Sequence, residues 1–333
     1  MSTHRVLVTG ASGFIGRHVA HGLAGRGHEV IASGRDAARL DANRDSARRI
    51  QCADLAADPL EPMLDGCDTV VHCAALSAPW GSRVEFERAN VLATRRLLDA
   101  ACRSGVRRFI HLGSPSIYFR FRDQYDVGEA FVPPRRWITE YARSKWASED
   151  CVREASDGPL QTLILRPRAV FGEGDRAILP RLLAVAERGW FPLVAGGEAL
   201  IDVTRVDNLS GLIADCVERG WSGSGQAYNV TNGEPLRVRD LLSALFTRMG
   251  RRVRWVSVPR GPALAAAWLA EQVALRRPGQ PEPKLTRYGL GVVGYAQTLD
   301  IRRARAELGY RPTPGIAAGL EAFANAWSDH DHA

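Results

Sequence analysis

The sequence predicts an α/β fold built on a doubly wound parallel sheet, with a smaller α/β unit towards the C-terminus. Three observations predict it. Short β-rich runs alternate with helical patterns through the first half of the chain, a glycine-rich turn follows the first run, and the alternation ends after Pro167. Parallel strands need crossovers of about a dozen residues or more, which the helices supply. The expected strands are 6–8, 30–31, 69–72, 109–112 and 162–165, and the expected helices are 14–25, 83–103 and 139–155.

The composition is that of a globular protein, with 45% hydrophobic and 24% charged residues among 333. The formal charge of +7 comes from dispersed basic residues interleaved with acids, so we expect no nucleic-acid partner. No apolar run approaches the roughly 20 residues that cross a bilayer, and Met1 leads directly into the first strand, which favours a cytoplasmic location. The six cysteines form no C-x-x-C pair, and we expect no metal site.

The turn after the first strand carries three glycines at the spacing G-x-x-G-x-x-G, in Thr9-Gly10-Ala11-Ser12-Gly13-Phe14-Ile15-Gly16. Gly10 permits the tight turn, Gly13 lets the backbone approach a pyrophosphate, and Gly16 lets the helix lie close to the strand. The first N–H groups of that helix can then bind the anion. A simple glycine-rich loop is the alternative, but the position between a strand and a helix favours a Rossmann dinucleotide site.

The end of the second strand indicates which dinucleotide binds. An NAD site usually has Asp or Glu there to accept from the ribose 2′-OH, whereas this chain has Arg35 after Ser33-Gly34. Because Arg35 can pair with a 2′-phosphate, we expect NADP. In the alternative, the cofactor is NAD, Arg35 is an ordinary surface residue and Asp36 binds the ribose. The further cofactor contacts that we expect are Ser33, Asp54 and Leu55, and below the cofactor Cys73, Ala74 and Ala75.

These features divide the chain into two expected domains. Residues 1–170 form an NADP-binding Rossmann domain, to which the chain returns at about 200–230. Residues 171–200 and 231–333 form a substrate-binding domain, where glycine and proline interrupt the pattern. Its expected helical segments are 178–188, 238–250 and the alanine-rich stretch 262–275.

Tyr141 and Lys145 are the strongest chemical signal. They stand four residues apart in a helical segment, so their side chains share one face. Only two of the 44 basic residues are lysines, and chance would place about 0.04 Tyr-x-x-x-Lys pairs in such a chain. An ammonium group lowers the pKa of a phenol from about 10, which suits proton transfer near neutral pH. Ser114 can orient a substrate oxygen, with Ser116 as the alternative. Before Pro115, Ser114 could also be an ordinary turn residue.

Taken together, several motifs resemble the extended short-chain dehydrogenase/reductase superfamily over nearly the whole chain. They are the glycine turn, the set Ser114, Tyr141 and Lys145, Leu165-Arg-Pro167 and Val206-Asp-Asn208. A second group of motifs is most similar to the 3β-hydroxysteroid dehydrogenase-like branch, which includes bacterial 2-alkyl-3-ketoalkanoate reductases. That group is His72-Cys-Ala-Ala75, Trp80-Gly81, Tyr228-Asn-Val230, Leu285-Thr-Arg287 and Glu307-Leu-Gly-Tyr310.

The resemblance implies a role for each catalytic residue. Tyr141 is the acid/base, Lys145 also holds the nicotinamide ribose, and Ser114 orients the substrate oxygen. The backbone around Pro167 borders the nicotinamide, and the protein forms a homodimer. Two departures discriminate among members. Pro115-Ser116 follows Ser114 where dehydratases have acidic residues, and Ala169 stands about where nucleotide-sugar epimerases have an asparagine for the pyrophosphate.

We therefore predict an NADPH-dependent ketoreductase, or the reverse alcohol dehydrogenase, for an apolar keto substrate. Such a substrate could be a β-keto acid, a steroid-like ketone or a polyketide-type ketone. The expected substrate contacts are Trp80, Ser116 and Arg168, with an apolar lining from Ile117, Phe119, Phe121, Trp190 and segment 262–275. The alternatives are a nucleotide-sugar reductase or epimerase, and a non-catalytic regulator that senses the cofactor.

Overall fold

The computed structural model describes residues 3–175, 179–313 and 315–331. Its largest sheet has seven parallel strands in the order β12-β7-β5-β4-β1-β2-β3. Strand order runs outward from β1 in both directions, which is the doubly wound topology. The strands are β1 (Arg5–Thr9), β2 (Glu29–Gly34), β3 (Arg49–Cys52), β4 (Thr69–His72), β5 (Arg108–Leu112), β7 (Gln161–Pro167) and β12 (Gln226–Val230).

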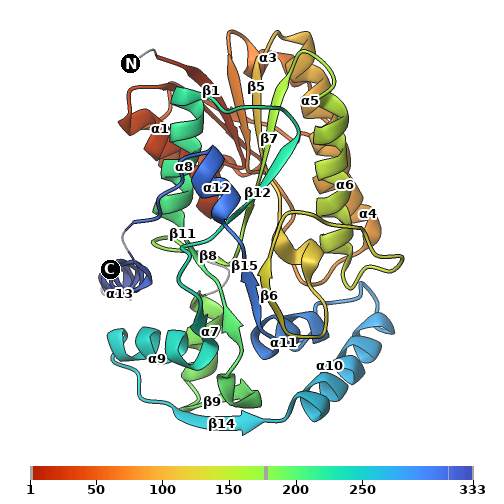
Figure 1. Cartoon of the computed structure of the whole chain (residues 1–333), viewed down its shortest axis with the longest axis vertical. Helices are drawn as coiled ribbons and strands as arrows, with labels where there is room; N and C mark the ends of the chain where they lie inside the picture. The colour runs from red at the N-terminus through yellow and green to blue at the C-terminus, as the bar shows by residue number, and fades with distance from the viewer. Residues whose placement is uncertain (1–2, 176–178, 314, 332–333) are drawn as a thin grey trace.

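Helices cover both faces of this sheet (Figure 1). α1 (Phe14–Gly25) and α8 (Val206–Arg219) pack together on one face, and α5 (Ala93–Arg103) and α6 (Glu140–Ala155) pack on the other. Because both faces are covered, most residues of these strands are buried, whereas β3 at the edge of the sheet has no buried residue. The predicted doubly wound α/β fold is confirmed. The same part of the chain has short helices at α2 (Ala37–Leu40), η1 (Asp41–Asn43) and α3 (Glu61–Leu64).

The helix predicted at 83–103 contains one wider turn. α4 (Arg83–Phe86) leads into a π-helical turn, η2 (Glu87–Leu92), and then into α5. Asn90 in this turn accepts the Leu76 N–H at 2.7 Å and donates to the Leu76 carbonyl at 3.1 Å. Its amide also donates to the Ser144 hydroxyl of α6 at 2.9 Å. The π-turn therefore ties the loop after β4 to α6, and turns of this kind are frequent at functional sites.

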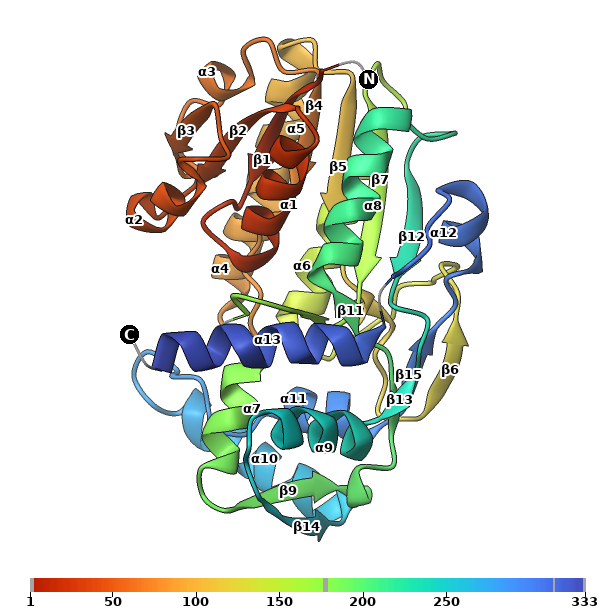
Figure 2. The ribbon, with the colours of Figure 1, turned by 90° about the vertical axis from the view of Figure 1, so that its left-hand side faces the viewer.

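A smaller α/β unit adjoins the sheet, with α13 crossing beneath the large sheet in Figure 2. Its apolar core includes Leu183, Leu242, Phe246 and Phe323. The strands are β13 (Leu236–Arg237), β10 (Leu200–Ile201), β15 (Gln297–Leu299) and β6 (Gln124–Val127) in one sheet, and the pairs β8 (Val170–Phe171) with β11 (Thr204–Arg205) and β9 (Trp190–Val194) with β14 (Arg254–Val258). The helices of the chain not yet named are η3 (Pro115–Tyr118), α7 (Leu179–Ala186), η4 (Ala195–Gly197), α9 (Val238–Arg248), α10 (Arg260–Leu275), α11 (Arg287–Gly294), α12 (Arg302–Glu307) and α13 (Ile316–Asp331).

The chain crosses between the two units more than once. It returns to the large sheet through α8 and β12, which both lie within residues 200–230, where we placed the return. Ile301, Ala304 and Tyr310 also belong to the core beside α1 and α8, so α12 lies with the large sheet although we placed 231–333 in the substrate domain. No helix among residues 3–175, 179–313 and 315–331 is long and apolar enough to cross a membrane.

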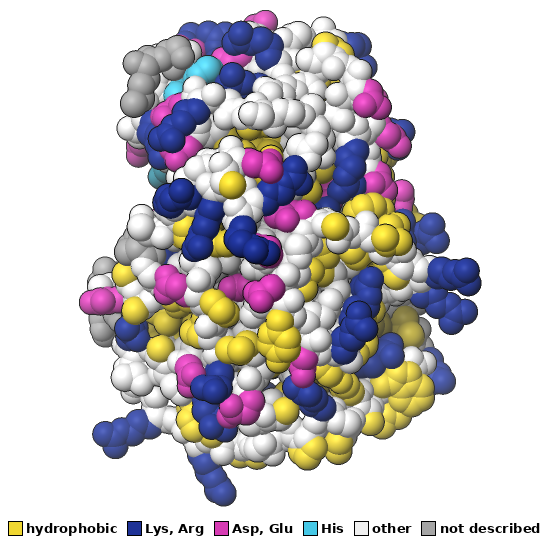
Figure 3. All heavy atoms as spheres, in the orientation of Figure 1, with side chains coloured by type: hydrophobic (Ala, Val, Ile, Leu, Met, Phe, Trp, Pro, Cys, Tyr) yellow, Lys and Arg dark blue, Asp and Glu magenta, His cyan; other side chains and the backbone are white. Residues whose placement is uncertain are grey.

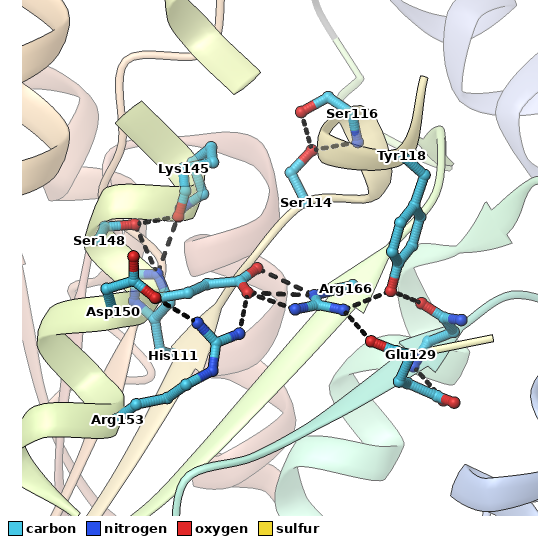
Figure 4. Close-up of polar contacts among 12 residues, drawn as sticks. His111, Ser114, Ser116, Tyr118, Glu129, Lys145, Ser148, Asp150, Arg153 and Arg166 are labelled. Atoms are coloured by element: carbon cyan, nitrogen blue, oxygen red, sulfur yellow. Dashed lines mark hydrogen bonds and ion pairs between the residues drawn. The ribbon is translucent and has the colours of Figure 1, made fainter. Parts of the chain in front are cut away.

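A buried ion pair joins α6 to β7 (Figure 4). Arg166 and Glu149 are only 1% and 0% exposed, and the Arg166 Nη2 lies 2.6 Å from the Glu149 carboxylate. The Nε atom of Arg166 also donates to both Glu149 oxygens, and its Nη1 donates to the Tyr118 hydroxyl and to the Glu129 carbonyl. Tyr118 in turn donates to the Asn229 side chain at 3.0 Å. Every donor nitrogen of the guanidinium therefore has a partner.

We expect Arg166→Met to lower the free energy of unfolding by about 3 kcal/mol, because the buried Glu149 carboxylate would keep only Arg153, whose side chain is 30% exposed, as a cationic partner. Arg103→Met is the matched control. It removes an arginine from an ion pair with Glu61 whose side chains are 62% and 51% exposed, so the loss should stay below about 1 kcal/mol. Urea unfolding followed by circular dichroism measures both. Equal losses in the two variants would contradict this account of the buried pair.

Candidate active site

The glycine turn is shaped so that side chains would obstruct it. Gly10 has φ +69°, a conformation that favours glycine, and a Cβ there would lie 2.7 Å from the Ala74 nitrogen. A Cβ on Gly16 would overlap the Gly10 carbonyl oxygen. α1 begins at Phe14, and Gly13 at its N-cap provides no side-chain cap. The first N–H groups of α1, including those of Phe14 and Ile15, are thus left for an anion.

A cleft opens beside this turn at the carboxyl ends of β1, β2 and β4. It collects most of the residues predicted to bind the cofactor, although their binding roles remain predictions. The predicted residues that line it are Gly10, Ser12, Gly13, Ser33, Arg35, Asp54, Leu55, Cys73, Ala74 and Ala75. Phe14, Ile15 and Gly16 continue from the turn into α1, and Pro167 ends β7.

The cleft has a cationic, hydroxyl-bearing corner at the end of β2. Arg35 is exposed, and no described residue forms an ion pair or side-chain hydrogen bond with its guanidinium. The Ser33 hydroxyl is buried without a partner in the part of the chain that the structure describes. Asp36 instead caps α2, accepting the Arg39 N–H at 3.1 Å. The carboxylate of the NAD alternative is therefore already engaged, and the corner suits a phosphate.

Asp54, which follows the neighbouring strand β3, supplies an acceptor in the lining of the same cleft. Its carboxylate accepts the Ala56 N–H at 2.9 Å and the Arg88 guanidinium at 2.7 Å. The Ala56 hydrogen bond lowers the pKa of Asp54, and Arg88 and Arg35 lower it further. Asp54 is thus held as a carboxylate in the cleft that the cofactor is predicted to occupy.

Lys145, the residue expected to hold the nicotinamide ribose, lies on the buried side of α6. The side chain is 2% exposed, and its Nζ donates to the Leu112 carbonyl at 2.6 Å and lies 3.4 Å from the His111 Nε2 (Figure 4). Burial lowers the pKa of Lys145 to about 8, and the Glu149 carboxylate one turn away opposes this decrease. An ammonium has three N–H donors, so one is left for a ribose hydroxyl.

Tyr141 precedes Lys145 by one turn. Thr139 starts α6 by accepting the Ala142 N–H at 3.0 Å, and the Tyr141 ring packs against Phe86, with centroids 6.2 Å apart. Ser114 follows β5, next to the Leu112 carbonyl that holds Lys145. Its hydroxyl donates to Ser116 at 3.0 Å and accepts the Ser116 N–H at 3.2 Å. Both predicted serines therefore lie together at the edge of the sheet where Lys145 ends.

A second cavity lies beside Thr139 and Glu140, and we call it the aromatic cavity after five of its fifteen lining residues, although Glu140, Glu271 and Arg287 also line it. Trp80, predicted to contact substrate, lines it and donates its indole N–H to the Gln280 carbonyl at 2.8 Å. The other residues of interest in the lining are Phe86, Phe121, Trp137, Thr139, Glu140, Glu271, Leu275 and Tyr288. On the outer side, α10 exposes Trp268, Leu269 and Val273, and hydrophobic side chains gather there at the lower right of Figure 3. On the same face, basic and acidic side chains are intermingled.

Some of the predicted lining lies elsewhere. Ile117 is fully buried in a small core with Tyr118 and Leu299. Trp190 lies on β9, where it pairs with β14, and is 41% exposed. Phe119 does not line the cavity but packs edge-to-face on Tyr288 with centroids 5.3 Å apart. We expected these residues in the lining because their side chains are aromatic or aliphatic. Residue type alone does not show which face of a helix or strand points into a cavity.

Tyr288 is the site residue that the sequence reasoning missed. It lines the cavity with Thr139 and Glu140, which directly precede Tyr141. Burial raises the pKa of Tyr288, nearby Tyr141 raises it further, and Arg168 lowers it. Tyr288 thus lies within electrostatic reach of both Tyr141 and Arg168. The signal available in the sequence was its position directly after Leu285-Thr-Arg287.

The fold, the glycine turn and the Tyr141–Lys145 pair together define an extended short-chain dehydrogenase/reductase. Residues 6–231 match the model of the NAD dependent epimerase/dehydratase family, and the chain belongs to this family. It is 37% identical to the uncharacterized protein YbjS of Escherichia coli strain K12, over 98% of both chains. It is 32% identical to a 2-alkyl-3-oxoalkanoate reductase of Stenotrophomonas maltophilia, over 95% of this chain and 97% of that one.

Two further proteins are similar to this chain, one in sequence and one in structure. A ketoreductase of Stigmatella aurantiaca, named for a farnesylated dihydroquinoline oxide, is 30% identical over 97% of this chain and 96% of that one. Among solved structures, MoeE5 in complex with UDP-glucose and NAD superposes with a TM-score of 0.77 at 25% identity, covering 99% of this chain and all of that one. The protein is therefore an NAD(P)-dependent oxidoreductase, as predicted.

We expect Gly16→Ala to weaken cofactor binding at least about 10-fold, because its Cβ would push α1 away from the turn. Gly25→Ala is the matched control at the exposed end of the same helix, where a Cβ meets no atom within 4 Å. It should leave binding unchanged. Titration of NADPH fluorescence measures both affinities. Normal cofactor affinity in Gly16→Ala would contradict the predicted close approach of helix and turn.

Reduction should also depend on pH through Lys145. The ammonium is charged below its pKa of about 8, so we expect carbonyl reduction to decline as the pH rises through that value. Glu149→Gln removes the carboxylate that raises this pKa and should move the decline to lower pH. The profile of kcat/KM against pH measures the shift. Glu61→Gln, at the exposed pair with Arg103, should leave the profile unchanged, and an unshifted Glu149→Gln profile would exclude this coupling.

Proposed function

We propose that the protein is an NADPH-dependent ketoreductase acting on an apolar keto compound, or the corresponding alcohol dehydrogenase. The observation that carries the proposal is that Tyr141 directly follows Thr139 and Glu140 and packs against Phe86, three residues that line the aromatic cavity, in a chain that also has a glycine-turn cleft shaped for a dinucleotide. The unpartnered Arg35 guanidinium and Ser33 hydroxyl support NADP, since they offer a cation and a hydrogen-bond donor where the 2′-phosphate would lie.

The residues have complementary roles in the proposed reaction. The nicotinamide, when bound, supplies or accepts the hydride. Tyr141 donates its hydroxyl proton to the substrate oxygen during reduction and takes it back during oxidation. Lys145 stabilises the phenolate that this leaves, because its ammonium is buried and shares the face of α6 with Tyr141. Ser114 donates a hydrogen bond to the substrate oxygen and orients it towards Tyr141, in place of its bond to Ser116.

The relatives support a keto substrate with a large apolar part. Two of the similar enzymes are named as reductases, one for 2-alkyl-3-oxoalkanoates and one for a farnesylated ketone. The aromatic cavity offers a comparable apolar surface through Trp80, Phe86 and Phe121.

A nucleotide-sugar substrate is the second candidate, favoured by the likeness to MoeE5 with its bound UDP-glucose. Ala169 argues against it. Its backbone has φ +42°, a left-handed conformation that asparagine tolerates better than alanine. The family resemblance implies that nucleotide-sugar epimerases have asparagine at this position, and its side-chain amide would bind the pyrophosphate. Ala169 has no such amide.

The proposal is tested by following NADPH and NADH oxidation over a panel of apolar ketones, β-keto acids and UDP-sugars. We expect a preference for NADPH that Arg35→Asp reduces by about 10- to 100-fold, the loss of a charged phosphate contact. Arg39→Asp makes the same charge change on α2 outside the cleft and should keep the preference. Tyr141→Phe should lower kcat at least about 100-fold while retaining NADPH binding. Preference for NADH, turnover of UDP-sugars alone, or full activity in Tyr141→Phe would refute the proposal.

A further inference from the structure

Arg168 is a buried cation with unused hydrogen-bonding capacity. It follows β7 directly, and its side chain is 6% exposed. Nη1 donates to the Gln297 side-chain oxygen, the one hydrogen bond that the described residues give this guanidinium. Nε is buried with no partner in the described part of the chain. Arg166, two residues earlier, has every donor nitrogen engaged, so of these two buried arginines only Arg168 is incompletely paired.

Nearby acids do not neutralise Arg168. Across residues 3–175, 179–313 and 315–331, no carboxylate lies within ion-pair distance of its guanidinium. Asp202 is close enough to favour the charged guanidinium, but its carboxylate accepts the Leu299 N–H at 2.7 Å and a hydrogen bond from Thr231. Burial lowers the pKa of Arg168 despite Asp202 and Tyr288. A buried guanidinium without an anionic partner lowers the stability of the protein unless a ligand supplies the anion.

The geometry of the guanidinium defines what would complete it. Gln297 is neutral and occupies Nη1. The Nε–H and the N–H of Nη2 that lies beside it point in parallel from the opposite edge of the plane. Two parallel donors on one edge of arginine match the two oxygens of a carboxylate. The free edge is therefore built for a planar anion rather than for a single oxygen.

Arg168 also lies close to the reacting groups. Its chain neighbour Pro167 ends β7, where the nicotinamide is predicted to lie. Tyr288 lines the aromatic cavity beside Thr139 and Glu140 and is within electrostatic reach of both Tyr141 and Arg168. Tyr288 thus places Arg168 in the neighbourhood of both Tyr141 and the aromatic cavity.

We propose that the free edge of Arg168 binds the carboxylate of the substrate, and that this substrate is a 3-oxo acid or the matching 3-hydroxy acid. The inference rests on the proposed function and adds a specificity residue to it. In a 3-oxo acid one carbon separates the carbonyl from the carboxylate, so the apolar remainder can extend towards Trp80 and α10. Arg168 then selects acids over simple ketones and fixes which carbonyl meets Tyr141.

Binding is measured with octanoate and octanamide, two unreactive probes that differ in charge and little in shape, on the protein saturated with NADP⁺. Calorimetric titration should give at least about 10-fold tighter binding of octanoate by the wild type. Arg168→Met should weaken octanoate about 100-fold and octanamide less than about threefold. Arg168→Lys keeps the positive charge but loses the two parallel N–H donors, so its affinity for octanoate should lie between those of the wild type and Arg168→Met. Arg260→Met, which removes a surface arginine bonded to the Gly294 carbonyl, is the control and should bind as the wild type does.

The outcomes separate the two proposals. Equal wild-type affinity for the two probes, or equal loss of both in Arg168→Met, would overturn the carboxylate subsite whatever the enzyme turns over. If Arg168→Met does not fold, the wild-type comparison and Arg168→Lys still decide. A parallel assay compares kcat/KM for 3-hydroxyoctanoate and its methyl ester. Arg168-dependent octanoate binding without turnover of any hydroxy acid or ketone would refute the proposed function and leave the subsite standing.

Discussion

The ion pair between Arg166 and Glu149 fixes the arrangement on which the site depends. It joins β7 to α6 inside the protein, so the helix cannot rotate on the sheet without separating two buried charges. Lys145 lies one turn before Glu149, and its Nζ reaches back to the Leu112 carbonyl of β5. The bond from Arg166 to Tyr118 extends the same constraint to the segment that carries the two serines. The relative positions of Tyr141, Lys145 and Ser114 thus follow from one contact that itself touches no substrate.

Two arginines separated by a single proline show how pairing distinguishes structural from binding roles. Arg166 has a carboxylate, a hydroxyl and a carbonyl around it, and a ligand could add nothing. Arg168 is nearly as buried but has one neutral partner. Arg35, in the cofactor cleft, has no partner among the described residues. Because its side chain is exposed to solvent, the missing partner costs the protein little stability. Of these three arginines, Arg168 would therefore be stabilised most by a bound anion.

The sequence predicted the sheet, the bounds of α1 and the glycine turn, because these depend on local periodicity and on residues adjacent in the chain. It also identified Lys145, since lysine is rare in this chain. It did not predict the Glu149 pair, the place of Tyr288, or that Ile117 and Trp190 lie away from the cavity. Those depend on which face of an element meets a distant segment, such as β15, whose Gln297 accepts a hydrogen bond from Arg168 just after β7. The roles of the site residues, the homodimer and the cytoplasmic location stay predictions.

The π-turn at Glu87–Leu92 changes how the helix from 83 to 103 is to be aligned with others. One inserted residue rotates everything before it by about 100° relative to everything after it. An amphipathic pattern counted without interruption from Arg83 therefore assigns the wrong face to one half of the helix. Comparisons of this helix between proteins need a gap near Asn90 wherever the partner lacks the extra residue. Without that gap, the residues that border the aromatic cavity from α4 would be matched to residues facing solvent.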